Sequence, residues 1–192
     1  MKRMARALST SFALLIVGAT HGCGGGKSAP PPPPCDQACL DGIAIRAMRE
    51  EMKLAFNLTF QGQPVGDHDF TVACPLGGTA RVFGNATSNA LQGSTMVKVT
   101  FVLDHCAYDR KDDDPKQTYQ MTVNGTITED GTLAVQPTST TALDIKSDTV
   151  SLTGNVYDPP IDYSEASCPV ALGQDGNNLS GTACGRTVGV LL

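Results

Sequence analysis

Two short acidic clusters are the residues best suited to hold a metal ion. One runs from Asp67 to Asp69 around His68, and the other runs from Asp112 to Asp114. Clustered carboxylate oxygens on loops are ligands that Ca²⁺ accepts in proteins, but the Asp-x-Asp-x-Asp-Gly pattern of a calcium loop is absent. Solvated loop tips that keep a sheet soluble are the preferred interpretation. The candidate calcium site comprises Asp67, Asp69, Asp112, Asp113 and Asp114.

A cysteine beside a histidine is a second possible source of chemistry. His105 precedes Cys106, and a histidine can activate a thiolate nucleophile. The number and spacing of the cysteines place Cys106 in a disulfide, which removes that thiolate. No Gly-x-Ser-x-Gly, Ser-x-x-Lys or His-Glu-x-x-His motif occurs. We therefore expect a protein without catalytic residues, cofactor or enzymatic activity.

Cys23 is a candidate acceptor of fatty acyl chains. It comes after a basic segment, residues 2–6, and an apolar run, residues 12–19, that is too short to span a bilayer as a helix. This arrangement is typical of an export signal. Ordinary secretion with cleavage near Ala19 remains an alternative, and it would leave a secreted or periplasmic protein.

Thr20-His21-Gly22-Cys23 resembles the lipobox of bacterial lipoprotein signals. Gly22 and Cys23 match that pattern, whereas Thr20 and His21 depart from it. The resemblance implies that cleavage makes Cys23 the first residue, that Cys23 carries several palmitate-type acyl chains, and that these chains anchor the protein in a membrane. Because Gly24 comes next, rather than aspartate, the resemblance also implies the outer membrane.

The segment after Cys23 is typical of a spacer. Glycines and small residues fill most of positions 24–29, and five prolines occupy 30–34. Prolines in polyproline II geometry extend about 3.1 Å per residue, so the run reaches roughly 15 Å. We expect a signal peptide at 1–22, a tether at 23–34 and a single domain at 35–192.

The charge of the chain limits its partners. The formal net charge is −5, and loss of Lys2, Arg3 and Arg6 with the signal would make it −8. An acidic body disfavours binding to nucleic acid or to anionic lipid headgroups. We expect contact with a membrane through the lipid anchor, another envelope protein as a candidate partner, and no contact with nucleic acid.

Six cysteines remain once Cys23 is set aside, and an even number in an exported chain suggests three disulfides. Cys74 and Cys106 lie symmetrically about the polar break at 88–93, which predicts that they face each other across a hairpin. The same register would place His68 opposite Asp112 and bring both acidic clusters to one end of the sheet.

A second cysteine pair brackets a turn. Cys168 and Cys184 flank Gln174–Asn177, a strong turn signal, and so should also face each other across a ladder. Cys35 and Cys39 then pair by elimination, although an i, i+4 bridge is awkward within a helix. Metal binding by thiolates is disfavoured because there is no Cys-x-x-Cys pair and the compartment is oxidising.

Residues 36–55 predict an amphipathic helix. Its apolar positions are Ile45, Met48, Met52 and Ala55, and its charged positions are Arg46, Arg49, Glu50 and Lys53. Apolar and polar residues then alternate through Phe56, Leu58 and Phe60, which is typical of a strand.

The rest of the chain alternates with a period of two. We expect strands near residues 70–74, 96–103, 119–128, 132–135, 143–145 and 150–156, with a turn at Asp130-Gly131. A repeated pattern predicts glycines within strands where the sheet bends or a second backbone approaches; these are Gly84, Gly125, Gly154 and Gly181. The expected fold is mainly β: a curved antiparallel β-meander with one N-terminal amphipathic helix packed on it.

The segment Cys74-Pro75-Leu76-Gly77-Gly78, with alternating strands and Cys106 after it, resembles a widespread type of uncharacterised exported bacterial protein. The resemblance covers residues 70–130 and implies a disulfide-bonded β-meander, without an activity.

Two functions fit these observations. The first is a non-enzymatic envelope lipoprotein with a structural or protein-binding role. The second is a carrier that holds an apolar ligand between the curved sheet and the helix bearing Met48 and Met52, similar in outline to lipocalins. An exposed apolar concavity would favour the carrier, and a filled interior would favour the first.

Overall fold

The structure is a computed structural model that describes residues 34–89, 93–134 and 140–192. The proposed signal peptide, Cys23 and all of the tether before residue 34 lie outside the described residues.

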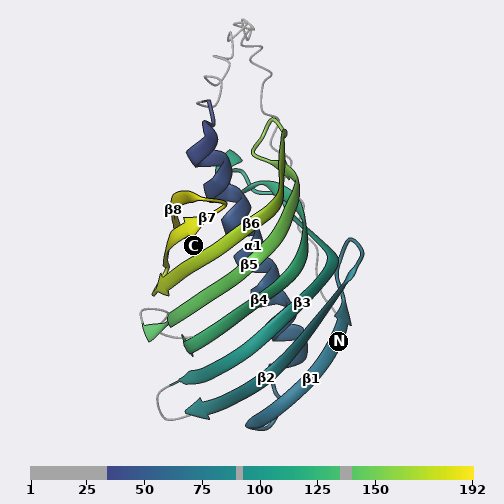
Figure 1. Ribbon diagram of the computed structural model, residues 1–192, viewed down its shortest axis with the longest axis vertical. Coiled ribbons are helices and arrows are strands. Elements are labelled where there is room, and N and C mark those ends of the chain that lie inside the picture. The colour runs from purple at the N-terminus through teal and green to yellow at the C-terminus, as the bar shows by residue number, and fades with distance from the viewer. Residues whose placement is uncertain (1–33, 90–92, 135–139) are drawn as a thin grey trace, which may run out of the picture. The chain divides into compact units, whose positions relative to one another are not determined.

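The described residues form one helix and then eight strands in a single antiparallel sheet, in which each strand pairs with the next along the chain (Figure 1). A 3₁₀ turn, η1 (Pro115–Gln117), lies between the third and fourth strands. The helix is α1 (Gln37–Thr59), and the strands are β1 (Gly66–Ala73), β2 (Thr79–Asn89), β3 (Ser94–Arg110), β4 (Tyr119–Ala134), β5 (Ala142–Val156), β6 (Ile161–Asp175), β7 (Asn178–Ala183) and β8 (Arg186–Leu191). The predicted curved β-meander with one packed helix is confirmed.

The sheet curves around α1, which runs along its concave side (Figure 1). Inward-facing side chains of the strands meet the apolar face of the helix in one core. Its largest members, all less than 2% exposed, include Ile45, Met48, Met52, Phe101, Leu103 and Ile127. Burying a side chain of this size contributes about 1.5–3 kcal/mol, so the helix and sheet depend on each other for stability.

The helix is longer than its sequence pattern predicts. Asp36 caps it by accepting a hydrogen bond from the Cys39 backbone N–H at 2.9 Å, and it continues to Thr59. The strand expected at Phe56–Phe60 is wrong. Phe56 and Phe60 lie on the same helical face, stack with ring centroids 5.2 Å apart and are both buried, so packing against the core overrides the local alternation.

The turn expected at Asp130-Gly131 is also wrong, because β4 runs through it. Gly131 has a φ of +137°, and a Cβ built there would lie 2.2 Å from the carbonyl oxygen of Ala142 in β5. This is the close backbone approach that the repeated glycine pattern predicts. The same approach by a neighbouring strand, with φ between +136° and +151°, occurs at Gly84, Gly125, Gly154 and Gly181.

All three expected disulfides are present: Cys35–Cys39, Cys74–Cys106 and Cys168–Cys184. Cys35 lies before the helix begins, which removes the difficulty of an i, i+4 bridge. The predicted register of the central hairpin is wrong, however. Cys74 comes just after β1 rather than lying in β2, and it reaches Cys106 where β3 has an irregularity between Leu103 and Cys106.

Candidate functional site

The two acidic clusters do not meet. β1 pairs with β2, so His68 faces Gly84 rather than Asp112, and the predicted pairing of His68 with Asp112 is wrong. Asp69 faces the first half of β3 across β2, whereas Asp112 lies beyond the other end of β3. The error arises because the chain inserts a tight turn after Cys74, which makes β1 and β2 the adjacent pair.

Each cluster is satisfied by its own neighbours. Arg81 donates two hydrogen bonds to Asp69, at 2.8 and 2.6 Å, and the Asn85 amide donates to Asp67. Hydrogen bonds from the loop backbone and from Arg110 keep the pKa of Asp112 below its ordinary value. Asp114 accepts from the Lys116 backbone N–H and caps η1, and Asp113 is exposed. These contacts support solvated, self-capped loops rather than a shared cation site.

The histidine beside Cys106 is held locally. His105 Nδ1 lies 2.8 Å from the Asp104 carboxylate, and both side chains are about three-quarters exposed. Cys106 is bonded to Cys74, so no thiolate is available at this position in the oxidised protein.

Glu51 is a buried carboxyl group that is not among the candidate residues of the sequence analysis. The residue is about 1% exposed, and neither oxygen has a hydrogen-bond partner in the part of the chain that the structure describes. Burial raises its pKa to about 9, so the group is protonated at neutral pH. It adjoins the sulfurs of Cys74 and Cys106, but their bond to each other leaves no thiolate to complete a metal site.

A second buried polar cluster joins α1 to strands β4 and β6. Arg49 Nε donates to the Gln174 side-chain oxygen at 2.7 Å, and its Nη1 lies 3.5 Å from the Glu129 carboxylate. Arg49 and Glu129 are 3% and 2% exposed. Burial raises the pKa of Glu129, and the nearby Arg49 charge opposes this rise.

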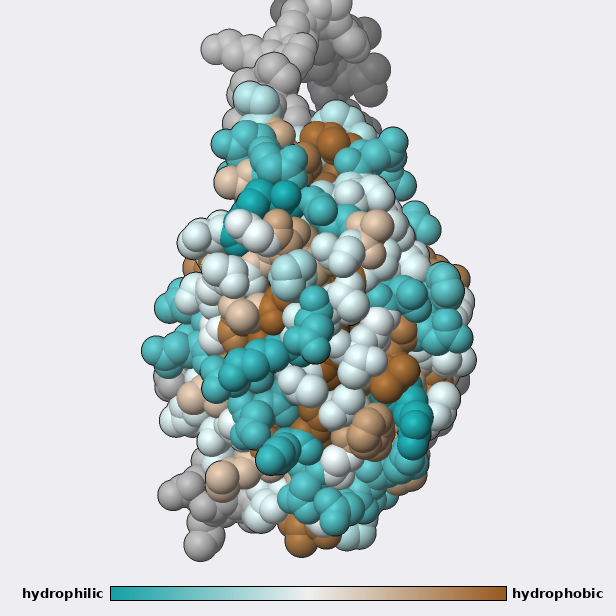
Figure 2. All heavy atoms as spheres, in the orientation of Figure 1, coloured by the Kyte–Doolittle hydropathy of each residue, from teal (hydrophilic) through white to brown (hydrophobic). Residues whose placement is uncertain are grey.

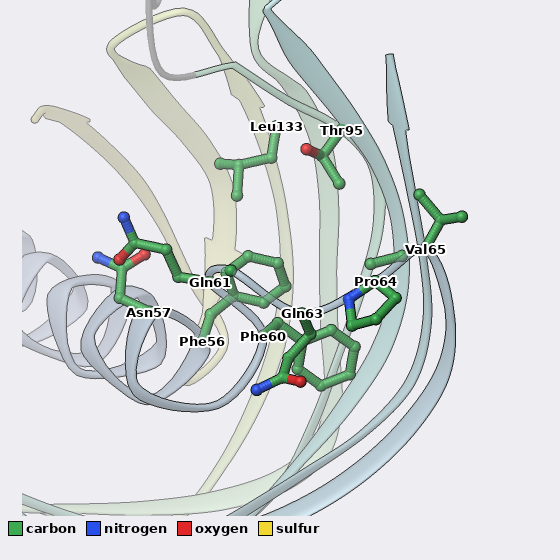
Figure 3. A pocket seen from close by; sticks show the side chains of 11 residues that line it. Phe56, Asn57, Phe60, Gln61, Gln63, Pro64, Val65, Thr95 and Leu133 are labelled. Carbon is green, nitrogen blue, oxygen red and sulfur yellow. The ribbon is translucent and has the colours of Figure 1, made fainter. Parts of the chain in front are cut away.

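This cluster opens into what we call the helix groove, which consists of two adjoining cavities of about 350 and 200 Å³. The cavities share Asn57, Gln61 and Leu133, so they lie next to each other beside the helix. In the smaller cavity the rings of Phe56 and Phe60 form an apolar floor facing Leu133 (Figure 3). The larger cavity is lined by Arg49, Glu50, Lys53, Ala134, Thr141 and Gln174, among others.

The other end of the helix is tied to the sheet by a charged cluster. Arg186 donates two hydrogen bonds to the buried Asp41 carboxylate, at 2.6 and 2.9 Å, and the Tyr163 hydroxyl donates a third. Burial raises the pKa of Asp41, but these donors outweigh it and the pKa lies below its ordinary value. The cluster joins α1 to β6 and β8, which is a structural role.

The sequence pattern places Arg49 on the exposed charged face of the helix, and this prediction is wrong. The sheet wraps far enough around α1 to bury Arg49 and Glu51 with the apolar residues. The spacing holds a signal for Glu51, because it lies three residues after Met48 on the buried side.

Comparison with known proteins gives no relative from which to assign a function. No protein-family model, curated protein or solved structure matches the chain. Within the described ranges, no helix has the length and apolar character needed to cross a membrane.

Proposed function

We propose that the protein is a non-enzymatic lipoprotein of the cell envelope, anchored through acylated Cys23, whose domain has a structural or protein-binding role. The lipobox-like sequence ending at Cys23 supports the anchor and, with Gly24, the outer membrane. Three disulfides support an oxidising compartment outside the cytoplasm, because such bonds persist in exported proteins.

The main support for a structural or protein-binding role is the filled interior of the domain. Met48 and Met52, which would have lined a carrier's cavity, are both 0% exposed and packed in the core. A carrier needs a cavity that encloses most of its ligand. With α1 occupying the concavity, interactions with a partner would use the outer surface and the helix groove.

The outer face of the sheet is compatible with this role. Figure 2 shows that hydrophilic and near-neutral side chains cover most of that side, with small separate hydrophobic areas. Outward positions are mostly polar, as at Gln120, Thr122, Thr128, Asp130, Asp144 and Lys146. Such a face supports a domain displayed in water rather than one buried in lipid.

Mass spectrometry of the mature protein from its native host tests the anchor. The expected N-terminal residue is Cys23 carrying fatty acyl chains, and Cys23→Ser should move the protein from the membrane to the soluble fraction. A mature N-terminus near residue 20 without acyl groups would instead show ordinary secretion and refute the anchor.

Native mass spectrometry of the Cys23→Ser protein tests the role of the domain. The expected mass is that of the polypeptide alone, with three disulfides and no lipid. A stoichiometric apolar ligand that survives purification would favour the carrier and contradict the filled interior.

A further inference from the structure

The helix groove combines charge, hydrogen-bonding groups and an apolar floor along one line. Arg49, Lys53 and Asn57 succeed one another at intervals of four residues on α1, and Gln61 continues the series just past the helix end. Residues four apart on a helix lie on the same face. The groove therefore has two cations at one end and amide side chains along its length.

Arg49 has unused hydrogen-bonding capacity. A guanidinium has five N–H donors, and in the described part of the chain Arg49 makes one hydrogen bond, to Gln174, and one longer ion pair, to Glu129. The residue is 3% exposed, so its position is fixed, and it lines the larger cavity. Fixed, partly unsatisfied donors in a sheltered site favour a carboxylate, which a guanidinium binds in a bidentate manner.

Lys53 adds a second cation at the rim. Its ammonium group is 3.8 Å from Glu50, and its side chain is 57% exposed, so it can turn toward a ligand in the groove. Glu50 and Glu129 are the acidic partners of these two cations: Glu50 lies 3.8 Å from Lys53, and Glu129 lies 3.5 Å from Arg49.

The amide side chains indicate that the group attached to the carboxylate is polar. Asn57, Gln61 and Gln63 line the cavities, and each offers both donors and acceptors. A peptide main chain presents donors and acceptors in the same mixture, whereas a fatty acyl tail presents neither. The rings of Phe56 and Phe60 supply an apolar floor for a side chain (Figure 3).

We propose that the helix groove binds the C-terminal segment of a partner polypeptide, with its terminal carboxylate at Arg49 and Lys53 and its last side chains over Phe56 and Phe60. This assignment rests on the protein-binding role proposed above and specifies the site and the class of partner. The volumes of the two cavities suit a segment of a few residues.

Binding is tested with the full chain carrying Cys23→Ser, isotopically labelled for NMR. The probe is an N-acetylated tetrapeptide of serine, two alanines and a C-terminal leucine, used with a free carboxylate and as its C-terminal amide. The free acid should shift the side-chain amide signals of Asn57, Gln61 and Gln63 with saturation. The amide form should bind at least about tenfold more weakly, because it cannot accept the charged hydrogen bonds.

Matched variants locate the charge effect. Lys53→Met should weaken binding of the free acid about three- to fivefold, as expected for a partly exposed ion pair, and leave the amide form unchanged. Lys98→Met, on the exposed face of β3, removes the same charge elsewhere and should change neither. Asn57→Phe should fill the part shared by both cavities and abolish binding of both forms.

Three results would overturn the inference: equal affinity for acid and amide, no effect of Lys53→Met, or no shifts with any peptide. Saturable binding of decanoate in place of the peptide would reassign the groove to amphiphiles. None of these results affects the lipid anchor, which the N-terminal mass tests separately.

Discussion

Replacing Glu51 with methionine should stabilise the protein, by an amount that grows with pH. Glu51 is almost fully buried, and within the described ranges its carboxyl group has no hydrogen-bond partner. Methionine has a similar length and a flexible thioether that fills core space. The substitution therefore removes an unsatisfied ionisable group without opening a cavity.

The magnitude comes from proton linkage. Burial raises the pKa of Glu51 from 4.5 to about 9, and each unit corresponds to about 1.4 kcal/mol. Between these two values the folded protein retains a proton that the unfolded chain has released. The free energy of unfolding must therefore fall as pH rises, by up to about 1.4 kcal/mol per unit from this group.

The assay is chemical denaturation of the wild type and Glu51→Met at pH 5.5, 7 and 8.5, without reductant so that the disulfides stay closed. Counting only ionisation, Glu51→Met should be more stable by about 1 kcal/mol at pH 5.5, about 3 at pH 7 and about 5 at pH 8.5. Glu129, whose pKa is also raised, is present in both proteins and cancels in the difference. Glu50→Met, which removes the adjacent carboxylate from a side chain that is 25% exposed, is the matched control.

A stability difference that does not change with pH would refute the reasoning, because it would mean that Glu51 titrates at the same pKa in the folded and unfolded states. A loss of stability in Glu51→Met at every pH would show that the carboxyl group makes a favourable interaction.

Two further sites test the packing. Gly154→Ala should lower the free energy of unfolding by at least about 2 kcal/mol in a thermal melt, because the added Cβ would lie 2.1 Å from a backbone oxygen at a φ of +151°. Gly189→Ala is the control, because open space surrounds Gly189. Equal effects of the two substitutions would contradict the close approach at Gly154. Asp41→Asn should lower the free energy of unfolding by about 2 kcal/mol near neutral pH, because Arg186 loses one of the two carboxylate partners that the structure describes and keeps only Glu165. The loss should shrink at acid pH, since a carboxyl group with a lowered pKa contributes stability above its unfolded pKa and loses it as pH falls through the folded one. Asp69→Asn, in a half-exposed Arg pair, should cost much less than Asp41→Asn in the same denaturation series, and equal costs would contradict the role of burial.

The sequence was most informative where a local pattern and the tertiary structure agree. Alternation with a period of two predicted the meander, and the even number of cysteines with the turn at Gln174–Asn177 predicted the bridges. The glycine pattern predicted close strand contacts because no residue with a Cβ fits there. The turn predicted at Asp130-Gly131 is wrong because a glycine is also needed inside a strand where the backbone of the neighbouring strand lies very close.

The helix groove could not be predicted in the same way. Its residues come from α1 and from strand ends far apart in the sequence, and only the curvature of the sheet brings Arg49 to Gln174. The register of β1 was missed for a related reason. A disulfide between Cys74 and Cys106 fits a sheet in which the strand before Cys74 pairs directly with β3, and it also fits one in which β2 lies between them. The tight turn after Cys74 produces the second arrangement, in which β1 is the edge strand.

The buried charges differ in what their burial achieves. Arg49, Glu51 and Glu129 are all at most 3% exposed, and burying such groups destabilises the folded state unless they are paired. Arg49 lines a cavity and keeps donors for a ligand, so its burial preorganises a site. Glu51 lies against a closed disulfide and lines neither cavity of the groove, so its burial has no corresponding gain. Removing Glu51 should therefore raise stability and leave peptide binding unchanged, whereas the stabilisation by bound peptide should be smaller in Lys53→Met and absent in Asn57→Phe.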